Sequence, residues 1–205
     1  MSLDFRKEQQ RYYHFAKHLF PVGFAHYMRP KSIEDLFRAI GLTRIKRSKV
    51  LEVGCGQGYL VNHFLYAGAQ HVVGTEIDPQ ILMTIPKQAY TVYEPGTSRR
   101  KYKQTVEFKL QPFEQTDPHI QVDIITIFIG NIAIVEKAIH MFRNNTYIKV
   151  LAFMVPTRNF NKEELMNWCD MYRWNKTEFS IALSGSGEQR RTIVLKKPTH
   201  VEDLT

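Results

Sequence analysis

The sequence has few cysteines and no long apolar stretch. Only Cys55 and Cys169 occur among 205 residues. They come without histidines at metal-ligand spacing, so we expect neither a disulfide framework nor a metal site. No run of about 18 apolar residues is present, which argues against a membrane-spanning helix. The first residues are polar and show no secretory signal, so the expected location is intracellular, cytoplasmic or nuclear, in a reducing compartment.

Acidic residues are also scarce relative to basic ones. The chain has 28 Lys and Arg residues against 20 Asp and Glu, which gives a net charge of +8. A basic balance favours polyanionic partners or acidic protein surfaces, and a solvated basic surface is the alternative. No internal repeat or long linker is visible, so the length predicts a single domain.

A glycine-rich turn between an expected strand and an expected helix is the most informative segment. Residues 50–58 read VLEVGCGQG, with glycine at three alternate positions, and the helical pattern YLVNHFL follows. Such glycines permit positive φ and let a ligand approach the main chain. The next expected strand ends at Glu76, whose carboxylate can accept both hydroxyls of a ribose. Together they indicate a nucleoside-binding half-sheet, although any βαβ turn can use glycine.

Two details separate this turn from a dinucleotide-binding one. The spacing is G-x-G-x-G, and Glu52 precedes the first glycine by two residues. That carboxylate would repel a pyrophosphate but attract an ammonium group. The run EVGCGQG, followed by GTEIDP at 74–79, resembles motifs I and II of the class I, Rossmann-like methyltransferases that depend on S-adenosyl-L-methionine (SAM). The resemblance implies that the glycine turn packs on the aminoacyl end of SAM, that Glu76 binds its ribose, and that S-adenosyl-L-homocysteine is the product.

The resemblance also assigns further residues to the cofactor. Family members often place an acid after the third strand to hold the adenine amino group, whereas here either Gln111 or Glu114 would make that contact. The aromatic N-terminal segment is expected to cover the cofactor side. The predicted cofactor-binding residues are Glu52, Gly54, Cys55, Gly56, Gln57, Gly58, Glu76, Ile77, Gln111, Pro112, Phe113, Tyr13 and Tyr27.

Strand and helix patterns alternate along the chain. Strands are expected at 49–53, 71–76, 105–110, 122–129, 148–155, 177–183 and 191–197, and helices at 5–20, 32–40, 58–67, 79–89, 132–142 and 161–172. This order predicts an α/β fold with a mostly parallel seven-stranded sheet and helices on both faces. The antiparallel terminal hairpin supports the methyltransferase resemblance independently. We expect a helical arm over 1–31 packing on the core, a methyltransferase domain over 32–198 and a tail over 199–205.

The segment after the fourth strand bears on the acceptor. The N-P-P-[YF] tetrad that holds a planar exocyclic nitrogen is absent, and no cysteine follows the fourth or fifth strand. The segment FIGNIA at 128–133 is similar to the corresponding segment of non-SET protein lysine methyltransferases. That similarity makes Asn131 and Phe128 the candidate catalytic residues, with Asn131 near the target nitrogen and Phe128 in a lysine channel. The alternative for Asn131 is a helix N-cap.

A basic segment within residues 90–103 favours RNA instead. Four cationic side chains and three tyrosines lie there. This combination can bind phosphates and stack on bases, and a solvated loop is the alternative. The predicted substrate-binding residues are Arg99, Arg100, Lys101, Lys103 and, after the fifth strand, Arg158. The sequence thus predicts a SAM-dependent methyltransferase with a macromolecular acceptor, protein lysine or RNA. The alternative is a non-catalytic SAM-fold module that binds nucleic acid or a protein partner.

Overall fold

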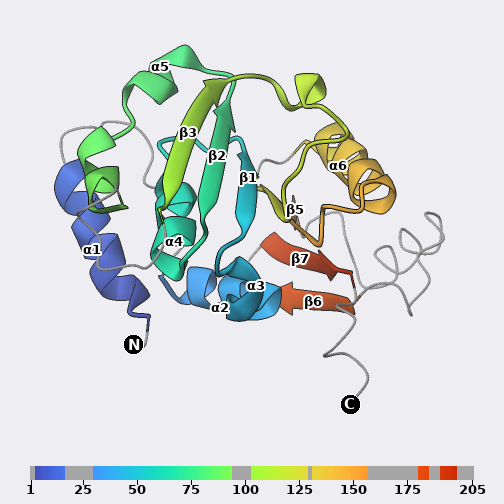
Figure 1. The fold of residues 1–205 in the computed structure, drawn as a ribbon, viewed down its shortest axis with the longest axis horizontal. Helices are drawn as coiled ribbons and strands as arrows, with labels where there is room; N and C mark the ends of the chain where they lie inside the picture. The colour runs from blue at the N-terminus through green and yellow to red at the C-terminus, as the bar shows by residue number, and fades with distance from the viewer. Residues whose placement is uncertain are drawn as a thin grey trace.

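One mixed β-sheet organises the chain in the computed structural model, which describes residues 3–16, 30–93, 103–128, 131–156, 180–184 and 190–197 (Figure 1). Its seven strands follow the order β3-β2-β1-β4-β5-β7-β6. The first five strands are parallel, and β7 runs antiparallel to both β5 and β6. The predicted α/β fold, with its antiparallel terminal hairpin, is confirmed. The strands are β1 Lys49–Val53, β2 His71–Glu76, β3 Thr105–Leu110, β4 Ile124–Ile127, β5 Val150–Pro156, β6 Ser180–Ser184 and β7 Arg190–Lys196.

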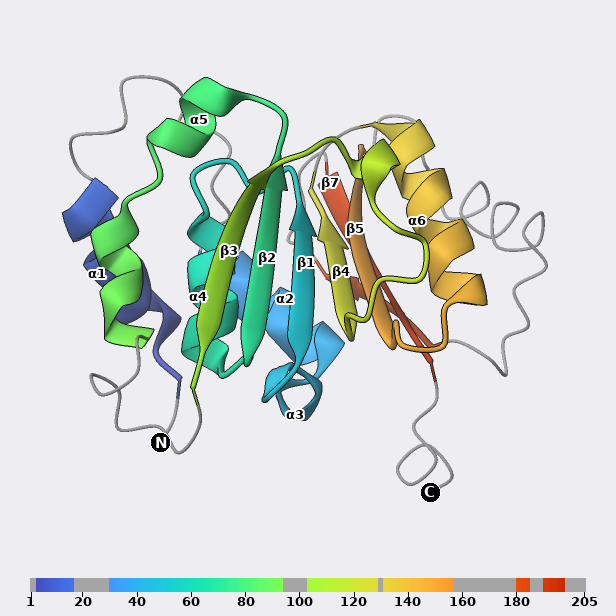
Figure 2. The same ribbon diagram turned by 45° about the horizontal axis from the view of Figure 1, so that its top comes forward.

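Helices pack on both faces of this sheet (Figure 2). They are α1 Phe5–Ala16, α2 Pro30–Ile40, α3 Leu42–Ile45, α4 Tyr59–Ala67, α5 Pro79–Met83, α6 Ile132–Asn144 and the 3₁₀ segments η2 Lys87–Tyr93 and η3 Phe113–Gln115. Successive strand residues point to opposite faces, so Val50 packs in the core with α1, α2 and α4, whereas Leu51 packs in the core under α6. Within the described ranges, no helix is long and apolar enough to cross a bilayer.

The predicted helix over 79–89 is wrong. Helix α5 ends at Met83, and the chain resumes as the 3₁₀ segment η2. Pro86 lies between them; it lacks an N–H group and disfavours α conformation in the residue before it. As a result Tyr90 and Tyr93, which the sequence placed in the basic segment, are only 5% and 6% exposed in the core. These two tyrosines are therefore not available to stack on bases.

The start of α2 also differs from the sequence prediction. The helix begins at Pro30, two residues before the predicted start at Ser32. Proline suits the first turn of a helix because its missing N–H has no partner there in any case. The predicted end is correct: Gly41 has φ 99°, and its N–H donates to the Phe37 carbonyl.

A buried histidine makes the stability of the fold dependent on pH. His63 in α4 has no exposed surface; its Nδ1 lies 2.8 Å from the Tyr59 carbonyl oxygen, and its Nε2 has no partner among the described residues. Burial lowers the pKa of His63 to about 4. Its unfolded pKa is about 6.5, so the unfolded chain binds the proton more readily and stability falls as the pH drops from 6.5 towards 4.

We therefore expect acidification from pH 7 to pH 5 to lower the free energy of unfolding by about 2 kcal/mol through His63. Urea denaturation of the parent and of His63→Gln at both pH values measures this contribution. The variant should show a pH dependence weaker by that amount. His140→Gln, at an exposed position of α6, should behave like the parent. Equal pH dependence in His63→Gln and the parent would contradict the assignment.

Candidate cofactor-binding site

The glycine turn joins β1 to α4 at the carboxyl edge of the parallel strands. Gly54, Gly56 and Gly58 have φ values of 68°, 55° and 81°, a conformation that costs other residues about 1–2 kcal/mol. A Cβ added at Gly58 would lie 2.3 Å from the Tyr90 hydroxyl oxygen, whereas one added at Gly56 would meet nothing within 4 Å. Gly58 is therefore required by packing, while Gly56 borders open space from which a ligand can reach the main chain.

Glu76, at the end of β2, ties this turn to the next one. Its Oε2 accepts a hydrogen bond from the Gly56 N–H at 3.0 Å, and its Oε1 accepts from the N–H groups of Ile77 at 2.8 Å and Asp78 at 3.2 Å. A carboxylate has about four acceptor positions, so about one is left for a ligand. The prediction that Glu76 accepts both ribose hydroxyls is narrowed by this geometry to a single additional hydrogen bond.

Glu52 is a buried carboxyl group without a full set of partners. It is 4% exposed on β1, and its Oε2 has no hydrogen-bond partner in the described part of the chain. Burial raises the pKa of Glu52 well above its ordinary value. A buried polar atom left unpaired is unfavourable. The site therefore has an unused acceptor two residues before the glycine turn, which a cationic or N–H donor on a ligand would satisfy.

Two tyrosines, one from α1 and one from η2, donate hydrogen bonds to the glycine turn. The Tyr12 hydroxyl donates to the Gln57 carbonyl at 2.5 Å, and the Tyr90 hydroxyl donates to the Gly58 carbonyl at 2.6 Å. Tyr13, the residue predicted for this role, stacks instead on Tyr59 with ring centroids 5.8 Å apart, so its cofactor contact stays a prediction. The sequence signal for Tyr12 was its place on the same face of α1 as Phe5 and Glu8, at a spacing of seven and four residues.

A buried ionic network fixes where α1 docks. The Glu8 carboxylate is paired with Arg11 at 2.5 Å and accepts from Asn62 Nδ2 at 2.7 Å and from the Tyr93 hydroxyl at 3.0 Å. Arg11 also donates to the Asn62 side-chain oxygen at 2.7 Å and to the Ala89 carbonyl at 2.8 Å. These contacts join α1 to α4 and η2, so the helix is positioned by hydrogen-bond geometry as well as by its apolar face.

The other predicted cofactor residues fall into separate environments. Ile77 is 71% exposed beside Glu76, and the Gln111 N–H donates to the Glu76 carbonyl, which brings both to the same edge. Phe113 is instead buried in the core under α6, so Gln111 and Pro112 are the more accessible residues after β3. Cys55 is buried in the turn, where burial raises the pKa of its thiol. The predictions for Tyr27, Arg99, Arg100, Lys101 and Arg158 lie outside the described residues.

Asn131 follows β4 at this edge and caps α6. Its Oδ1 accepts from the N–H groups of Ala133 at 3.0 Å and Ile134 at 3.5 Å. Asn131 is therefore a helix N-cap, and its catalytic role stays a prediction. Phe128 is partly buried against the core shared with α4. Lys103 precedes β3 and so lies at the opposite edge of the sheet from the glycine turn.

The sequence pattern of a methyltransferase domain family matches residues 24–177, more than half of the chain. The chain belongs to this methyltransferase family. The match includes the glycine turn, Glu76 and the segment after β4. It confirms the predicted enzyme class, a SAM-dependent methyltransferase, and favours this over a non-catalytic module.

Solved structures share the fold of this methyltransferase at low sequence identity. An rRNA methylase from Streptococcus thermophilus is 15% identical with a TM-score of 0.56, covering 85% of this chain and 100% of the other. A ribosomal protein L11 methylase from Lactobacillus delbrueckii subsp. bulgaricus is 15% identical, TM-score 0.57, with coverage of 83% and 78%. Magnesium protoporphyrin IX methyltransferase from Synechocystis, solved with bound SAM, is 15% identical, TM-score 0.56, with coverage of 96% and 99%. No curated protein sequence matches the chain.

Replacing Glu76 tests the cofactor site without adding a side chain to the glycine turn. Glu76→Ala should weaken SAM binding by about 1–3 kcal/mol, because hydrogen bonds to a charged acceptor are lost. Isothermal titration calorimetry measures the change. Asp78→Ala is the matched control, since its carboxylate caps α5 by accepting from Gln80 and Ile81. If Glu76→Ala binds SAM as the parent does, the cofactor lies elsewhere.

Proposed function

We propose that this methyltransferase transfers the methyl group of SAM to RNA. The observation that carries the choice of a polyanionic acceptor is the charge of the chain, 28 basic against 20 acidic residues and a net charge of +8. A basic protein attracts phosphates over long range. An intracellular location, cytoplasmic or nuclear, forms part of the proposal, because the substrate would be found there.

The residues at the carboxyl edge fit the groups of SAM. Glu52 would take the ammonium group, since its Oε2 is buried and unpaired. The main chain at Gly56 would lie against the aminoacyl end, and Glu76 would accept one ribose hydroxyl. Ile77 and Gln111 stand at the same edge for the adenine. SAM supplies an electrophilic methyl group and its own leaving group, and the protein must align the acceptor atom and exclude water.

A protein lysine side chain is the second candidate acceptor. It is favoured by Asn131 and Phe128, which stand at the end of β4 with the spacing of the lysine methyltransferase segment. The Asn131 Oδ1 already accepts N–H groups of α6. Alignment of a target nitrogen by this residue would therefore rely on the remaining capacity of the same oxygen or on Nδ2.

The two acceptors are separated by the chemistry of the labelled product. The protein is incubated with SAM carrying a labelled methyl group and with mixed RNA and protein from cells. Each product is then treated with nuclease or protease. Label that is released by nuclease and survives protease supports RNA, whereas label that is released only by protease would replace RNA with protein as the acceptor.

A further inference from the structure

A row of three lysines and one aspartate runs across the end of the sheet that lies opposite the glycine turn. Lys49, Asp123, Lys149 and Lys197 occupy equivalent positions on or next to the neighbouring strands β1, β4, β5 and β7. Backbone N–H groups join them in sequence: Asp123 donates to Lys49 and Lys149 donates to Asp123, both at 2.8 Å, and Lys197 donates to Lys149 at 2.9 Å. Neighbouring strands lie about 4.8 Å apart, so the three lysines lie across four neighbouring strands within about 14 Å, or three inter-strand spacings.

Two of these lysines direct their ammonium groups to the C-terminal end of α6. Lys197 Nζ donates to the Asn145 carbonyl at 2.8 Å and lies 4.9 Å from the Phe142 ring centroid, and Lys149 Nζ donates to the Thr146 carbonyl. Carbonyl groups hold a cation in place without cancelling its charge. Burial, and to a smaller extent the adjacent Lys149 charge, lower the pKa of Lys197 to about 8.

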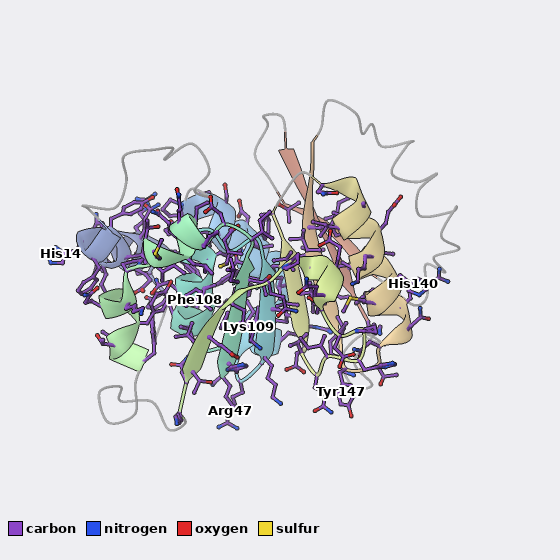
Figure 3. The ribbon with its side chains drawn as sticks, turned by 90° about the horizontal axis from the view of Figure 1, so that it is seen from above. His14, Arg47, Phe108, Lys109, His140 and Tyr147 are labelled. Atoms are coloured by element: carbon purple, nitrogen blue, oxygen red, sulfur yellow. The ribbon has the colours of Figure 1, made fainter. Side chains whose placement is uncertain are left out.

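Helix α3 extends the row with further cations. Arg44 donates to the Lys197 carbonyl at 3.0 Å, which places α3 beside the end of β7. The exposed residues Lys46 and Arg47 follow α3 directly. Figure 3 shows Arg47 on the same border of the molecule as Tyr147. Tyr147 is 52% exposed and offers an aromatic ring next to the lysines.

The lysines of this row differ in their ion pairing from other cations among the residues that the structure describes. In those residues Lys46, Lys49, Lys149 and Lys197 form no ion pair, whereas Lys7, Lys31, Arg38 and Lys109 each have an acidic partner. The one acid of the row, Asp123, accepts the backbone N–H of Lys49 at 2.8 Å. Like charges held side by side repel one another, and a bound polyanion would relieve that repulsion.

We propose that this basic edge, Lys46, Arg47, Lys49, Lys149 and Lys197 with Tyr147, is a docking surface for the phosphate backbone of RNA. Cations interleaved with an aromatic side chain suit a nucleic acid strand better than an acidic protein surface, because bases can stack while phosphates pair. The inference rests on the proposed function for the identity of the polyanion. This basic edge and the glycine turn lie at opposite ends of β1, which has five residues and is about 17 Å long. An RNA that contacts both must therefore span about that distance.

The test compares two variants with the same loss of charge. Lys46→Gln, Lys49→Gln and Lys149→Gln are combined in one protein, and Lys7→Gln, Lys31→Gln and Arg38→Gln in the control. Binding of a fluorescent structured RNA is measured by anisotropy at several salt concentrations. The first variant should bind RNA at least tenfold more weakly, as an order of magnitude. The slope of log K against log salt should also be less steep by about 2–3, because each lost phosphate contact lowers it by about 0.7–0.9. The control should stay within about twofold of the parent.

Thermal denaturation checks that each variant is folded. If loss of the Lys149 contact at Thr146 unfolds the triple variant, the double variant Lys46→Gln with Lys49→Gln replaces it, with an expected decrease in salt dependence of about 1.4–1.8. Equal RNA binding by the basic-edge variant and the control overturns the proposal. Lysine-dependent binding to phosphatidylcholine–phosphatidylserine vesicles with none to RNA also overturns it. Loss of RNA binding in a protein that methylates only protein supports the docking surface and refutes RNA as the acceptor.

Discussion

Gly56→Arg is expected to abolish SAM binding, with no measurable heat in calorimetry at concentrations that saturate the parent. The main chain at Gly56 borders open space at the carboxyl edge, where an added Cβ would meet nothing within 4 Å. An arginine side chain would extend into the space from which a ligand reaches the turn, and its φ of 55° would add about 1–2 kcal/mol of strain.

Two variants separate blockage of the site from backbone strain. Gly56→Ala has the same strain without the bulk and should retain SAM binding at reduced affinity. Gly41→Arg places the same side chain at another positive φ, 99°, before α3 and away from the turn. It should bind SAM like the parent. If Gly56→Arg binds SAM normally while folded, the glycine turn is not the cofactor site.

Arg11→Ala is expected to lower the free energy of unfolding by about 3–5 kcal/mol. The substitution leaves the Glu8 carboxylate, 5% exposed, without its charged partner, and an uncompensated buried charge is strongly destabilising. The Asn62 and Tyr93 contacts would remain but cannot replace the cation. Urea denaturation followed by circular dichroism measures the change.

Arg38→Ala is the matched control for this prediction. It breaks the Arg38 ion pair with Glu34, whose side chains are 68% and 45% exposed, so its effect should stay within about 1 kcal/mol. The double variant Glu8→Gln with Arg11→Ala should recover part of the loss because no buried charge remains. Equal stability losses in Arg11→Ala and Arg38→Ala would show that Glu8 is not dependent on its partner.

The strands that form the cofactor edge were predicted well from the sequence. The limits of β1, β2 and β3 agree with the structure. Gly54 follows β1, Glu76 ends β2, and Gln111 and Pro112 follow β3, so the residues at each strand end mark where the strand stops. The positive φ of Gly56 and Gly58 follows from the same spacing. Strand ends and glycine conformations depend on residues nearby in the chain, so they can be predicted from a single sequence.

The contacts that hold α1 against the turn were not predicted. The hydrogen bond from Tyr12 to Gln57 joins residues 45 positions apart, and the Glu8–Asn62 contact joins residues 54 apart. A polar residue on an apolar face gives no indication of which distant partner satisfies it. The break at Pro86 was missed for a different reason, since the apolar periodicity on both sides outweighed a local steric rule. The role of Asn131 at the acceptor stays a prediction, because helix capping and alignment of a substrate place the same residue at the same position.

The hydrogen bond from Tyr12 to the Gln57 carbonyl couples docking of α1 to cofactor binding at the glycine turn. Ligands that favour the ordered turn must favour the docked helix to the same extent, because linkage between two equilibria is reciprocal. Amide hydrogens of α1 should therefore exchange with solvent more slowly as SAM is added, and a protease should cut the first 16 residues less readily. A fusion placed at the N-terminus would change cofactor affinity even though it never reaches the glycine turn.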